Sequence, residues 1–222
     1  MTNSSAAPMA VDVWSDVVCP WCCIGRAHLE TALSQFEHAE DVVVTWRSFE
    51  LDPQAATSQD ITIDEHLQRK YGISAAEVAA MQANVTARAA GAGLEFHLES
   101  THPTNTFDAH RLLHLARVTD RQDALKGRLF RAYFTEGLPI GEPAVLAALA
   151  VVVGLEPDEV ADVLATDRFA DAVRADEAQA RAYGVTGVPF YVIDARYGVA
   201  GAQPVEQLLA ALQQAWADRA VA

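Results

Sequence analysis

Two cysteines separated by a proline and a tryptophan are the residues of this sequence best suited to chemistry. The motif Cys19-Pro20-Trp21-Cys22 follows an apolar run and begins a stretch of helical periodicity. Proline suits the first position of a helix, so Cys19 is predicted to be the N-cap, with its sulfur near the free backbone amides of the first turn. These amides and the helix dipole stabilise a thiolate. We therefore expect Cys19 to be an exposed, attacking thiol and Cys22 to be a more buried, resolving thiol.

The same spacing of cysteines also occurs in zinc sites and in pairs of ordinary buried thiols. A zinc site needs two more ligands at a matching spacing, whereas the third cysteine, Cys23, is merely adjacent to the pair. His110 and His114 lie four residues apart on one predicted helix, but no further histidine or carboxylate falls at a spacing that completes a site. We therefore predict no metal, a buried and inert Cys23, and a histidine pair that is on the surface or lines a pocket.

The elements around the motif are predicted to be strands near both ends of the chain and helices between them. Strands are expected at 10–15, 42–49, 190–194 and 196–200. Helices are expected at 20–36, 63–71, 75–91, 105–119, 121–136, 142–153, 157–165, 168–183 and 205–218. Two of these helices begin with the spacing of a capping box, Thr62 with Glu65 and Ser74 with Glu77. The order predicts an α/β fold in which a sheet domain, residues 1–60 and 170–222, is interrupted by an all-helical domain, residues 61–169.

The composition indicates a packed globular protein that avoids polyanions. Hydrophobic residues make up 51% of the 222 residues, and the formal net charge is −14. This charge repels nucleic-acid backbones and anionic lipid, so neither nucleic acid nor a membrane is expected as a partner. The segment from Met1 to Met9 does not have the pattern of a secretory signal, and no later stretch is long enough to span a bilayer. We expect a cytoplasmic protein, in which paired cysteines are usually catalytic or metal-binding.

Three segments of the chain resemble one known family. They are Trp14-Ser15-Asp16-Val17-Val18-Cys19-Pro20-Trp21-Cys22, Asn105-Thr106-Phe107-Asp108-Ala109-His110-Arg111 and Gly184-Val185-Thr186-Gly187-Val188-Pro189-Phe190. Together they resemble the DsbA-like thioredoxin superfamily, and within it the FrnE-like group, over nearly the whole chain. The resemblance implies a thioredoxin fold with a large helical insertion and the activity of a dithiol–disulfide oxidoreductase.

The resemblance also implies how the site is arranged. The redox-active pair is Cys19 and Cys22, supported by the proline and tryptophan between them, and no other cofactor is expected. The Val188–Pro189 bond is expected to be cis and to face the cysteines, with the Val188 backbone able to pair with an extended substrate. The expected substrate is a thiol or a disulfide, on a protein or a small molecule, with glutathione among the candidates. The family usually has an aromatic residue after the second cysteine, where this chain has Cys23. The oligomeric state stays open.

Four residues are candidates for lining a substrate pocket: Trp14, Asp16, Asn105 and His110. Asp16, three residues before Cys19, either raises the pKa of that thiol or caps the turn. His110 is expected where the inserted helices overhang the cysteines, in a position to tune the thiolate. Trp14 is more consistent with a core position, whereas Trp21 is expected to be partly exposed and to contact an apolar substrate.

The sequence leaves two other functions open. Related proteins with serine in place of the attacking cysteine resemble kappa-class glutathione transferases and 2-hydroxychromene-2-carboxylate isomerases, which use glutathione instead of their own dithiol. A glutathione-dependent isomerase or transferase is therefore the first alternative, and a non-catalytic substrate- or zinc-binding protein is the second. The presence of both Cys19 and Cys22 favours the oxidoreductase, although the direction of exchange and the redox partner do not follow from the sequence.

Overall fold

The computed structural model describes residues 7–57 and 61–219. The strands in these ranges are β1 (Met9–Ser15), β2 (Val42–Ser48), β3 (Phe190–Ile193) and β4 (Tyr197–Ala200). They form one mixed sheet in the order β2-β1-β3-β4, in which β1 is parallel to β2 and antiparallel to β3. β3 and β4 are antiparallel. The predicted strands agree closely with these bounds. Strands from the N-terminal and C-terminal parts of the described chain form one sheet, as expected.

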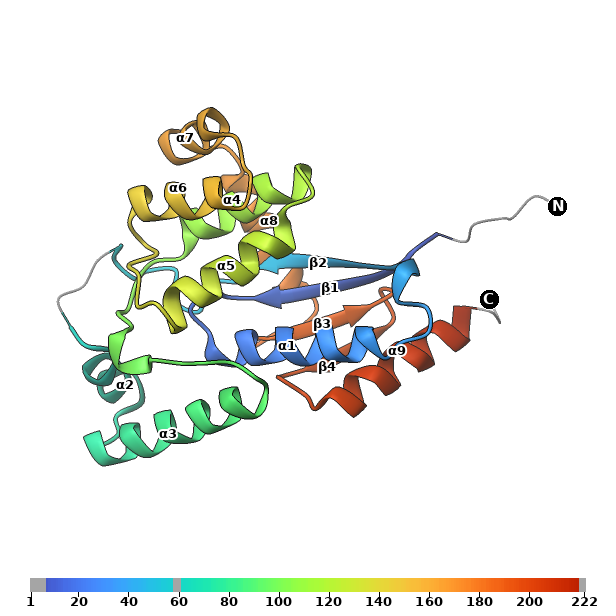
Figure 1. Ribbon diagram of the computed structural model, residues 1–222, viewed down its shortest axis with the longest axis horizontal. Helices are drawn as coiled ribbons and strands as arrows, with labels where there is room; N and C mark the ends of the chain where they lie inside the picture. Colours follow the sequence, from blue (N-terminus) through green and yellow to red (C-terminus); the bar gives the residue numbers. More distant parts are fainter. Residues whose placement is uncertain (1–6, 58–60, 220–222) are drawn as a thin grey trace.

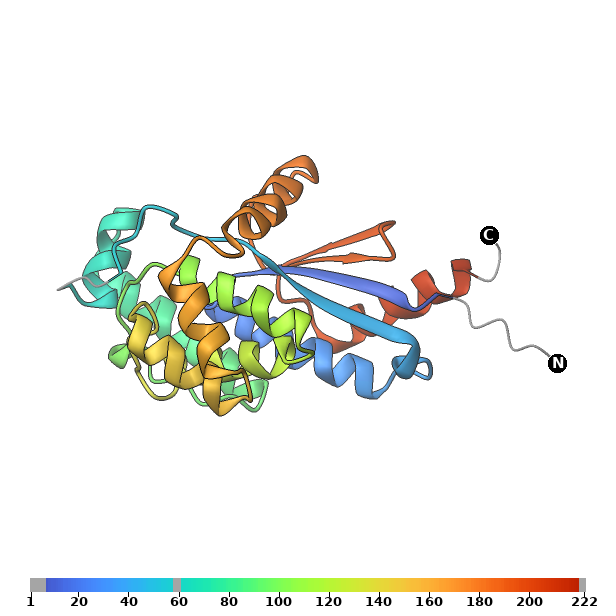
Figure 2. The same cartoon turned by 90° about the horizontal axis from the view of Figure 1, so that it is seen from above.

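Helices cover both faces of the sheet. α1 (Pro20–Ser34) and α9 (Val205–Arg219) pack together on one face, and α8 (Ala170–Ala182) lies on the other, as Figure 2 shows. Val11 and Val13 of β1 share a buried core with side chains of α1 and α9. Trp14 points to the other face and packs with Ala180 of α8. This alternation of apolar side chains explains why β1 forms the centre of a sheet that is covered on both sides.

The remaining α-helices of the described chain gather at the end of the sheet where β1 ends (Figure 1). They are α2 (Ile63–Tyr71), α3 (Ala75–Gly91), α4 (Phe107–Val118), α5 (Gln122–Phe134), α6 (Pro143–Val152) and α7 (Pro157–Ala165). The two predicted capping boxes are present at the starts of α2 and α3, each with both reciprocal hydrogen bonds. The α/β class with a helical insertion is therefore confirmed.

The inserted helices share an apolar core with the cysteine motif. Cys19 and Cys22 belong to the same buried cluster as Leu112 of α4 and Leu129 of α5. The insertion therefore packs directly on the start of α1 and covers it.

Two expectations reach beyond the described ranges. Residues 58–60 lie outside the described ranges, so the predicted domain boundary after residue 60 falls at the edge of a range. The division into domains stays a prediction. Residues 1–6 of the N-terminal segment also lie outside. In the part of the chain that is described, no helix is both long enough and apolar enough to cross a membrane.

Candidate active site

The cysteine motif lies directly after β1, at the start of α1. Cys19 has the extended backbone of an N-cap residue, with φ −92° and ψ 113°, and Pro20 is the first helical residue, as predicted. The Cys19 side chain makes no capping hydrogen bond to the described backbone. Its thiol instead donates to the carbonyl oxygen of Val188, with 3.7 Å between Sγ and oxygen. The reactive sulfur thus lies between the first turn of α1 and the loop before β3.

The two thiols of the motif differ in acidity. The hydrogen bond from the Cys22 thiol lowers the pKa of Cys19. The backbone amides of Cys22 and Trp21 lower it further, while burial and the charge of Asp16 oppose this effect. Burial raises the pKa of Cys22 well above its ordinary value, and the neighbouring Cys19 raises it more. The pKa of Cys19 is therefore lower than that of Cys22, in the direction expected from the sequence, and the Cys22 thiol contributes more to this than the amides of the first turn.

The expectation that Cys19 is exposed is wrong. The residue is 4% exposed, and Cys22 is fully buried. The reason is that the inserted helices pack over the start of α1, which the order of elements alone did not determine. The Cys19 residue instead lines a cavity.

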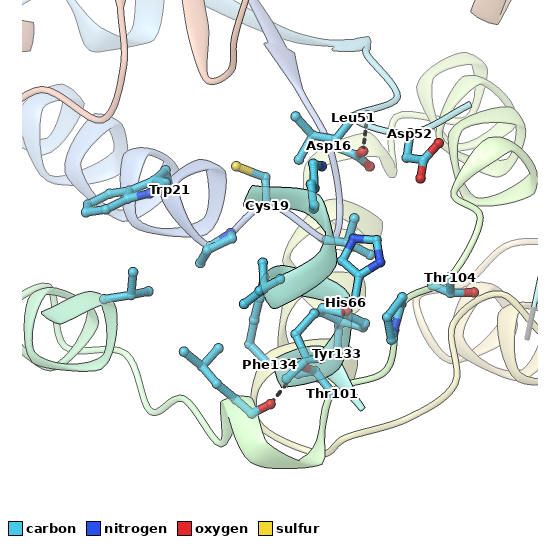
Figure 3. Close-up of a pocket in the computed structure, with 18 of the residues that line it drawn as sticks. Asp16, Cys19, Trp21, Leu51, Asp52, His66, Thr101, Thr104, Tyr133 and Phe134 are labelled. Atoms are coloured by element: carbon cyan, nitrogen blue, oxygen red, sulfur yellow. Dashed lines mark hydrogen bonds between the residues drawn. The ribbon is translucent and has the colours of Figure 1, made fainter. Parts of the chain in front are cut away.

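This cavity has a volume of about 320 Å³. The motif and the loop after β2 form one wall, and α2, α3 and α5 form much of the other. Figure 3 shows Cys19 between Trp21 and Asp16, facing His66 and Tyr133 across the cavity. Sequence reasoning missed the last two residues, because each lies within an amphipathic helix whose partner is fixed only by tertiary packing.

Trp21 is partly exposed, as predicted, and lines the cavity beside Pro20. The guanidinium carbon of Arg88, from α3, lies 5.9 Å from the centroid of the Trp21 ring. This is within the range of a cation–π contact. The indole thus forms an apolar part of the cavity wall, and Arg88 of α3 contacts its ring.

Asp16 performs both roles that the sequence left open. Its Oδ1 accepts a hydrogen bond from the amide of Val17 and its Oδ2 accepts one from the amide of Leu51, each at 2.7 Å. Its charge also raises the pKa of Cys19. Burial by itself would raise the pKa of Asp16, but the bonds from His110 and Leu51 lower it below its ordinary value. A carboxylate that fixes two loops therefore also opposes ionisation of the Cys19 thiol.

The histidine pair was predicted on the surface or lining a pocket, and the structure places both rings in the interior. His110 is 1% exposed, and its Nε2 lies 3.3 Å from Oδ1 of Asp16. His114 is 7% exposed, and its Nε2 lies 3.1 Å from Oδ2 of Asp176. The prediction was wrong because partners distant in sequence cover this face of α4. No group of three histidine, cysteine or acidic side chains in the described ranges could hold a metal ion.

Of the four pocket candidates, Asp16 lines the cavity. Trp14 is 2% exposed and its indole nitrogen donates to a backbone carbonyl of α8, so the structure places it in the core. Asn105 ties the loop after β2 to the start of α4 by hydrogen bonds of its side chain. His110 contacts Asp16, a residue of the cavity wall, but does not itself line the cavity. Trp14, Asn105 and His110 thus support the site from outside the cavity wall.

The loop before β3 brings Val188 to the cavity. The Val188–Pro189 bond is cis, and the Val188 carbonyl oxygen accepts a hydrogen bond from the Cys19 thiol. Gly25 of α1 lies against this loop, since a Cβ at that position would be 2.9 Å from Cγ of Pro189. The loop and the first turns of α1 are therefore in close contact.

Two further groups lie beneath the motif. Cys23 is 7% exposed, and burial raises its pKa to about 12, so it is a buried, protonated thiol. Lys126 of α5 is fully buried, and its Nζ donates to the carbonyl oxygen of Ser15 at 3.2 Å. Sequence reasoning missed Lys126. The available signal was its position three and four residues before Leu129 and Phe130, on the apolar face of its helix.

The chain is similar to known proteins over most of its length. A family profile described as "DSBA-like thioredoxin domain" matches residues 10–213. The "Uncharacterized protein YwbO" of Bacillus subtilis is 29% identical over 187 residues, which cover 82% of this chain and 86% of that protein.

Solved structures show the same similarity. The crystal structure of a probable DsbA oxidoreductase from Streptomyces coelicolor has 44% sequence identity and a TM-score of 0.89, covering 94% of this chain and 90% of that one. The cytosolic disulfide reductase DsbM from Pseudomonas aeruginosa, in a structure with GSH, has 18% identity and a TM-score of 0.65, covering 92% and 98% of the two chains. At that level of identity the second comparison shows a common fold.

Proposed function

The chain belongs to the DSBA-like thioredoxin domain family, and we propose that it is a thiol-disulfide oxidoreductase in which Cys19 attacks and Cys22 resolves. The observation that carries the proposal is the placement of the two thiols: Cys19 lines the cavity at the start of α1, whereas Cys22 is fully buried and does not line it. In keeping with this placement, the pKa of Cys19 is lowered and that of Cys22 is raised. Dithiol exchange needs this difference, because one sulfur must be a thiolate when the substrate binds. The other must stay protonated until the mixed disulfide has formed.

The proposed reduction of a disulfide proceeds in two steps. The Cys19 thiolate attacks one sulfur of the substrate, the substrate S–S bond breaks, and the first substrate thiolate leaves. Cys22 then loses its proton and attacks Cys19 Sγ, which forms the Cys19–Cys22 disulfide and expels the second substrate thiolate. Two electrons pass from the protein to the substrate. The reverse sequence oxidises a substrate dithiol.

The cavity supports a substrate with an apolar portion next to its sulfur. Trp21 and the inserted helices supply apolar walls, and the backbone of Val188 lies at the sulfur, where an extended peptide could pair with it. We therefore propose a protein or small-molecule thiol or disulfide as substrate, with glutathione among the candidates and no cofactor other than the dithiol. We further propose that it acts in the cytoplasm without nucleic-acid or membrane partners, which is consistent with the net charge of −14.

Single substitutions at the three cysteines test the proposal in an insulin-reduction assay and a dithiol-oxidation assay. Cys19→Ser should abolish turnover, and Cys22→Ser should accumulate covalent adducts at Cys19, because no internal thiol remains to release the substrate. Cys23→Ser is the matched control, since Cys23 is buried beside the pair but has no role in the exchange. Circular dichroism should show that all three variants are folded.

A glutathione-conjugation and isomerisation assay run alongside separates the alternative enzyme class. In that class glutathione supplies the reacting sulfur, so Cys22→Ser would keep full activity. A wild-type protein that lacks disulfide exchange but conjugates or isomerises with glutathione would refute the oxidoreductase. Stoichiometric zinc in the purified protein would instead support the binding-protein alternative.

A further inference from the structure

The cavity at Cys19 adjoins a second hollow, between α2 and the loop after β2. This hollow has a volume of about 460 Å³ and is lined by Leu51, Asp52, His66, Arg69 and Lys70. All of these except Arg69 also line the cavity. Leu51 is 38% exposed, and the side chains of Arg69 and Lys70 are exposed, whereas Cys19 is buried. These five residues therefore lie where the cavity borders solvent, and we call them the mouth.

Positive charge exceeds negative charge at the mouth, although the chain as a whole has 30 acidic and only 16 basic residues. Arg69 and Lys70 carry two positive charges, and Asp52 carries the one negative charge. Neither cation forms an ion pair with a residue in the described ranges. The acidic side chains in the first turn of α2 do not line the mouth, because Asp64 bonds to Gln82 and Glu65 to the start of its own helix. The mouth thus offers positive charge to a ligand.

His66 adds a hydrogen-bonding group one turn before Lys70. Its ring is half-buried in the wall of the cavity and has no hydrogen-bond partner among the described residues. Burial and the charge of Lys70 lower the pKa of His66, while the charge of Asp52 opposes them. A neutral imidazole still donates one hydrogen bond. His66 and Lys70 therefore present two donors on the same side of α2.

The interior of the cavity is suited to an apolar group. Its apolar lining includes the side chains of Trp21, Leu67, Met81, Val85, Leu98 and Phe134. Three of its hydroxyl groups already donate to backbone carbonyls, those of Thr101, Thr104 and Tyr133. Figure 3 shows Trp21 on one side of Cys19 and His66 on the other. A ligand in the cavity therefore meets apolar walls near the sulfur and free cations at the mouth.

The size of the cavity favours a small molecule. Its volume of about 320 Å³ lies at the lower end of the range of roughly 300–1,000 Å³ that is typical of small-molecule sites. A cavity of this size encloses an aromatic or aliphatic group together with the disulfide, and leaves a polar substituent at the mouth.

We propose that the site selects small disulfides that carry a carboxylate beside an apolar group, and that Lys70 binds this carboxylate at the mouth with His66 as a hydrogen-bond donor. The selection rests on the proposed function and leaves its chemistry unchanged. The Cys19 thiolate breaks the substrate S–S bond, Cys22 releases the bound half as a thiolate, and two electrons pass from the dithiol to the substrate. Lys70 keeps its proton throughout and acts on binding.

Two aromatic disulfides of similar size test this selection with the reduced protein in a stopped-flow experiment. Ellman's reagent carries a carboxylate on each ring, whereas dithiodipyridine is uncharged, and both release a product that absorbs light. The measured quantity is the second-order rate constant of the first release, which reports attack by Cys19. With Ellman's reagent it should fall about threefold to fivefold in Lys70→Met and about tenfold in Lys70→Glu. With dithiodipyridine it should change much less, and Lys70→Arg should restore the preference.

Arg196→Met is the matched control, because it removes the same charge from the protein at a distance from the mouth. Arg196 is exposed and its guanidinium carbon lies 5.8 Å from the Tyr197 ring centroid, much as Lys70 Nζ lies 5.9 Å from that of Tyr71. It lies in the turn between β3 and β4 and does not line the cavity. Both rate constants should therefore stay at the wild-type value in this variant.

Insulin reduction by the same variants separates a small substrate from an acidic protein. Lys70→Met should change insulin turnover less than about twofold, since only a small molecule fits the cavity and the mouth together. A loss on insulin as large as that on Ellman's reagent would assign the mouth to proteins and overturn the proposal. Unchanged rates in Lys70→Glu, equal losses on the two aromatic disulfides, or an equal loss in Arg196→Met would also overturn it. A wild-type protein that releases no second thiolate from either reagent refutes the proposed function, and the first-release rates still decide the role of Lys70.

Discussion

His110 in the helical insertion and Asp16 in the loop before the redox helix lie against each other, with 3.3 Å between Nε2 and Oδ1 and each side chain 1% exposed. The contact lowers the pKa of Asp16, whose charge in turn raises the pKa of Cys19. The inserted helices therefore influence the Cys19 thiol through a residue that follows β1, although neither His110 nor α4 reaches the cavity wall.

Replacing Asp16 by asparagine should move the midpoint of Cys19 alkylation to lower pH, because the carboxylate charge raises the pKa of that thiol. The change should also cost about 1–3 kcal/mol of unfolding free energy, since an amide can accept from only one of the two loops that Asp16 joins. Alkylation against pH, read by mass spectrometry, gives the midpoint. Asp52→Asn, in the same cavity wall, is the control. An unchanged or higher midpoint in Asp16→Asn would contradict the assigned effect.

The three cysteines should label in a fixed order. Cys19 should react with iodoacetamide near neutral pH, with a midpoint below the value of about 8.5 for a free thiol. Cys22 and Cys23 should label after denaturation, because burial raises the pKa of both. Peptide mapping of the alkylated, folded protein tests this order. Faster labelling of Cys22 or Cys23 than of Cys19 would reverse the roles assigned to the pair.

Gly25→Ala should destabilise the protein by about 1–3 kcal/mol, because the added methyl group has no room. It would overlap the hydroxyl of Tyr191 and lie 2.9 Å from Cγ of Pro189. Gly91→Ala is the matched control, since its methyl group would have nothing within 4 Å. That change should leave the stability unchanged or raise it by about 0.5–1 kcal/mol. Thermal denaturation of both variants measures the difference in melting temperature. Equal melting temperatures would show that the loop before β3 moves to make room for the methyl group, which contradicts the prediction.

Asp176→Asn should cost stability in a pH-dependent way. Burial alone would raise the pKa of Asp176, but the hydrogen bonds from His114 and the Ser48 amide, with the charge of Arg47, lower it. A carboxyl with a lowered pKa stabilises the fold above its unfolded pKa of about 3.9, and this contribution is lost as the pH falls through the folded pKa.

The expected difference in unfolding free energy between wild type and Asp176→Asn is about 1–3 kcal/mol at pH 6, and it should shrink toward pH 3. Urea denaturation across this range measures it. Asp171→Asn, an exposed carboxylate on the same helix, is the control and should show little dependence. A difference that is constant over the whole range would mean that the charge of Asp176 is not what stabilises the fold.

Local sequence patterns were sufficient to predict most elements and the N-cap position of Cys19. An apolar run identified β1, the spacing of Thr62 and Glu65 identified the start of α2, and the proline after Cys19 placed that cysteine at the N-cap. Each of these signals acts over a few residues, because hydrogen bonding and side-chain direction within a helix or strand depend on near neighbours. The assignment of Cys19 and Cys22 as attacking and resolving thiols follows from that same local geometry.

The tertiary structure decided which distant residues surround the pair. Asp16 and His110 are separated by 94 positions, and Ser15 and Lys126 by 111, so no local pattern could connect them. The burial of Cys19 beneath the insertion has the same origin, since covering a surface depends on how helices pack across the whole chain. The sequence by itself thus determined the element order and the position of the two cysteines at the start of a helix. Packing between segments far apart in the chain determined their access to solvent and the buried charges beside them.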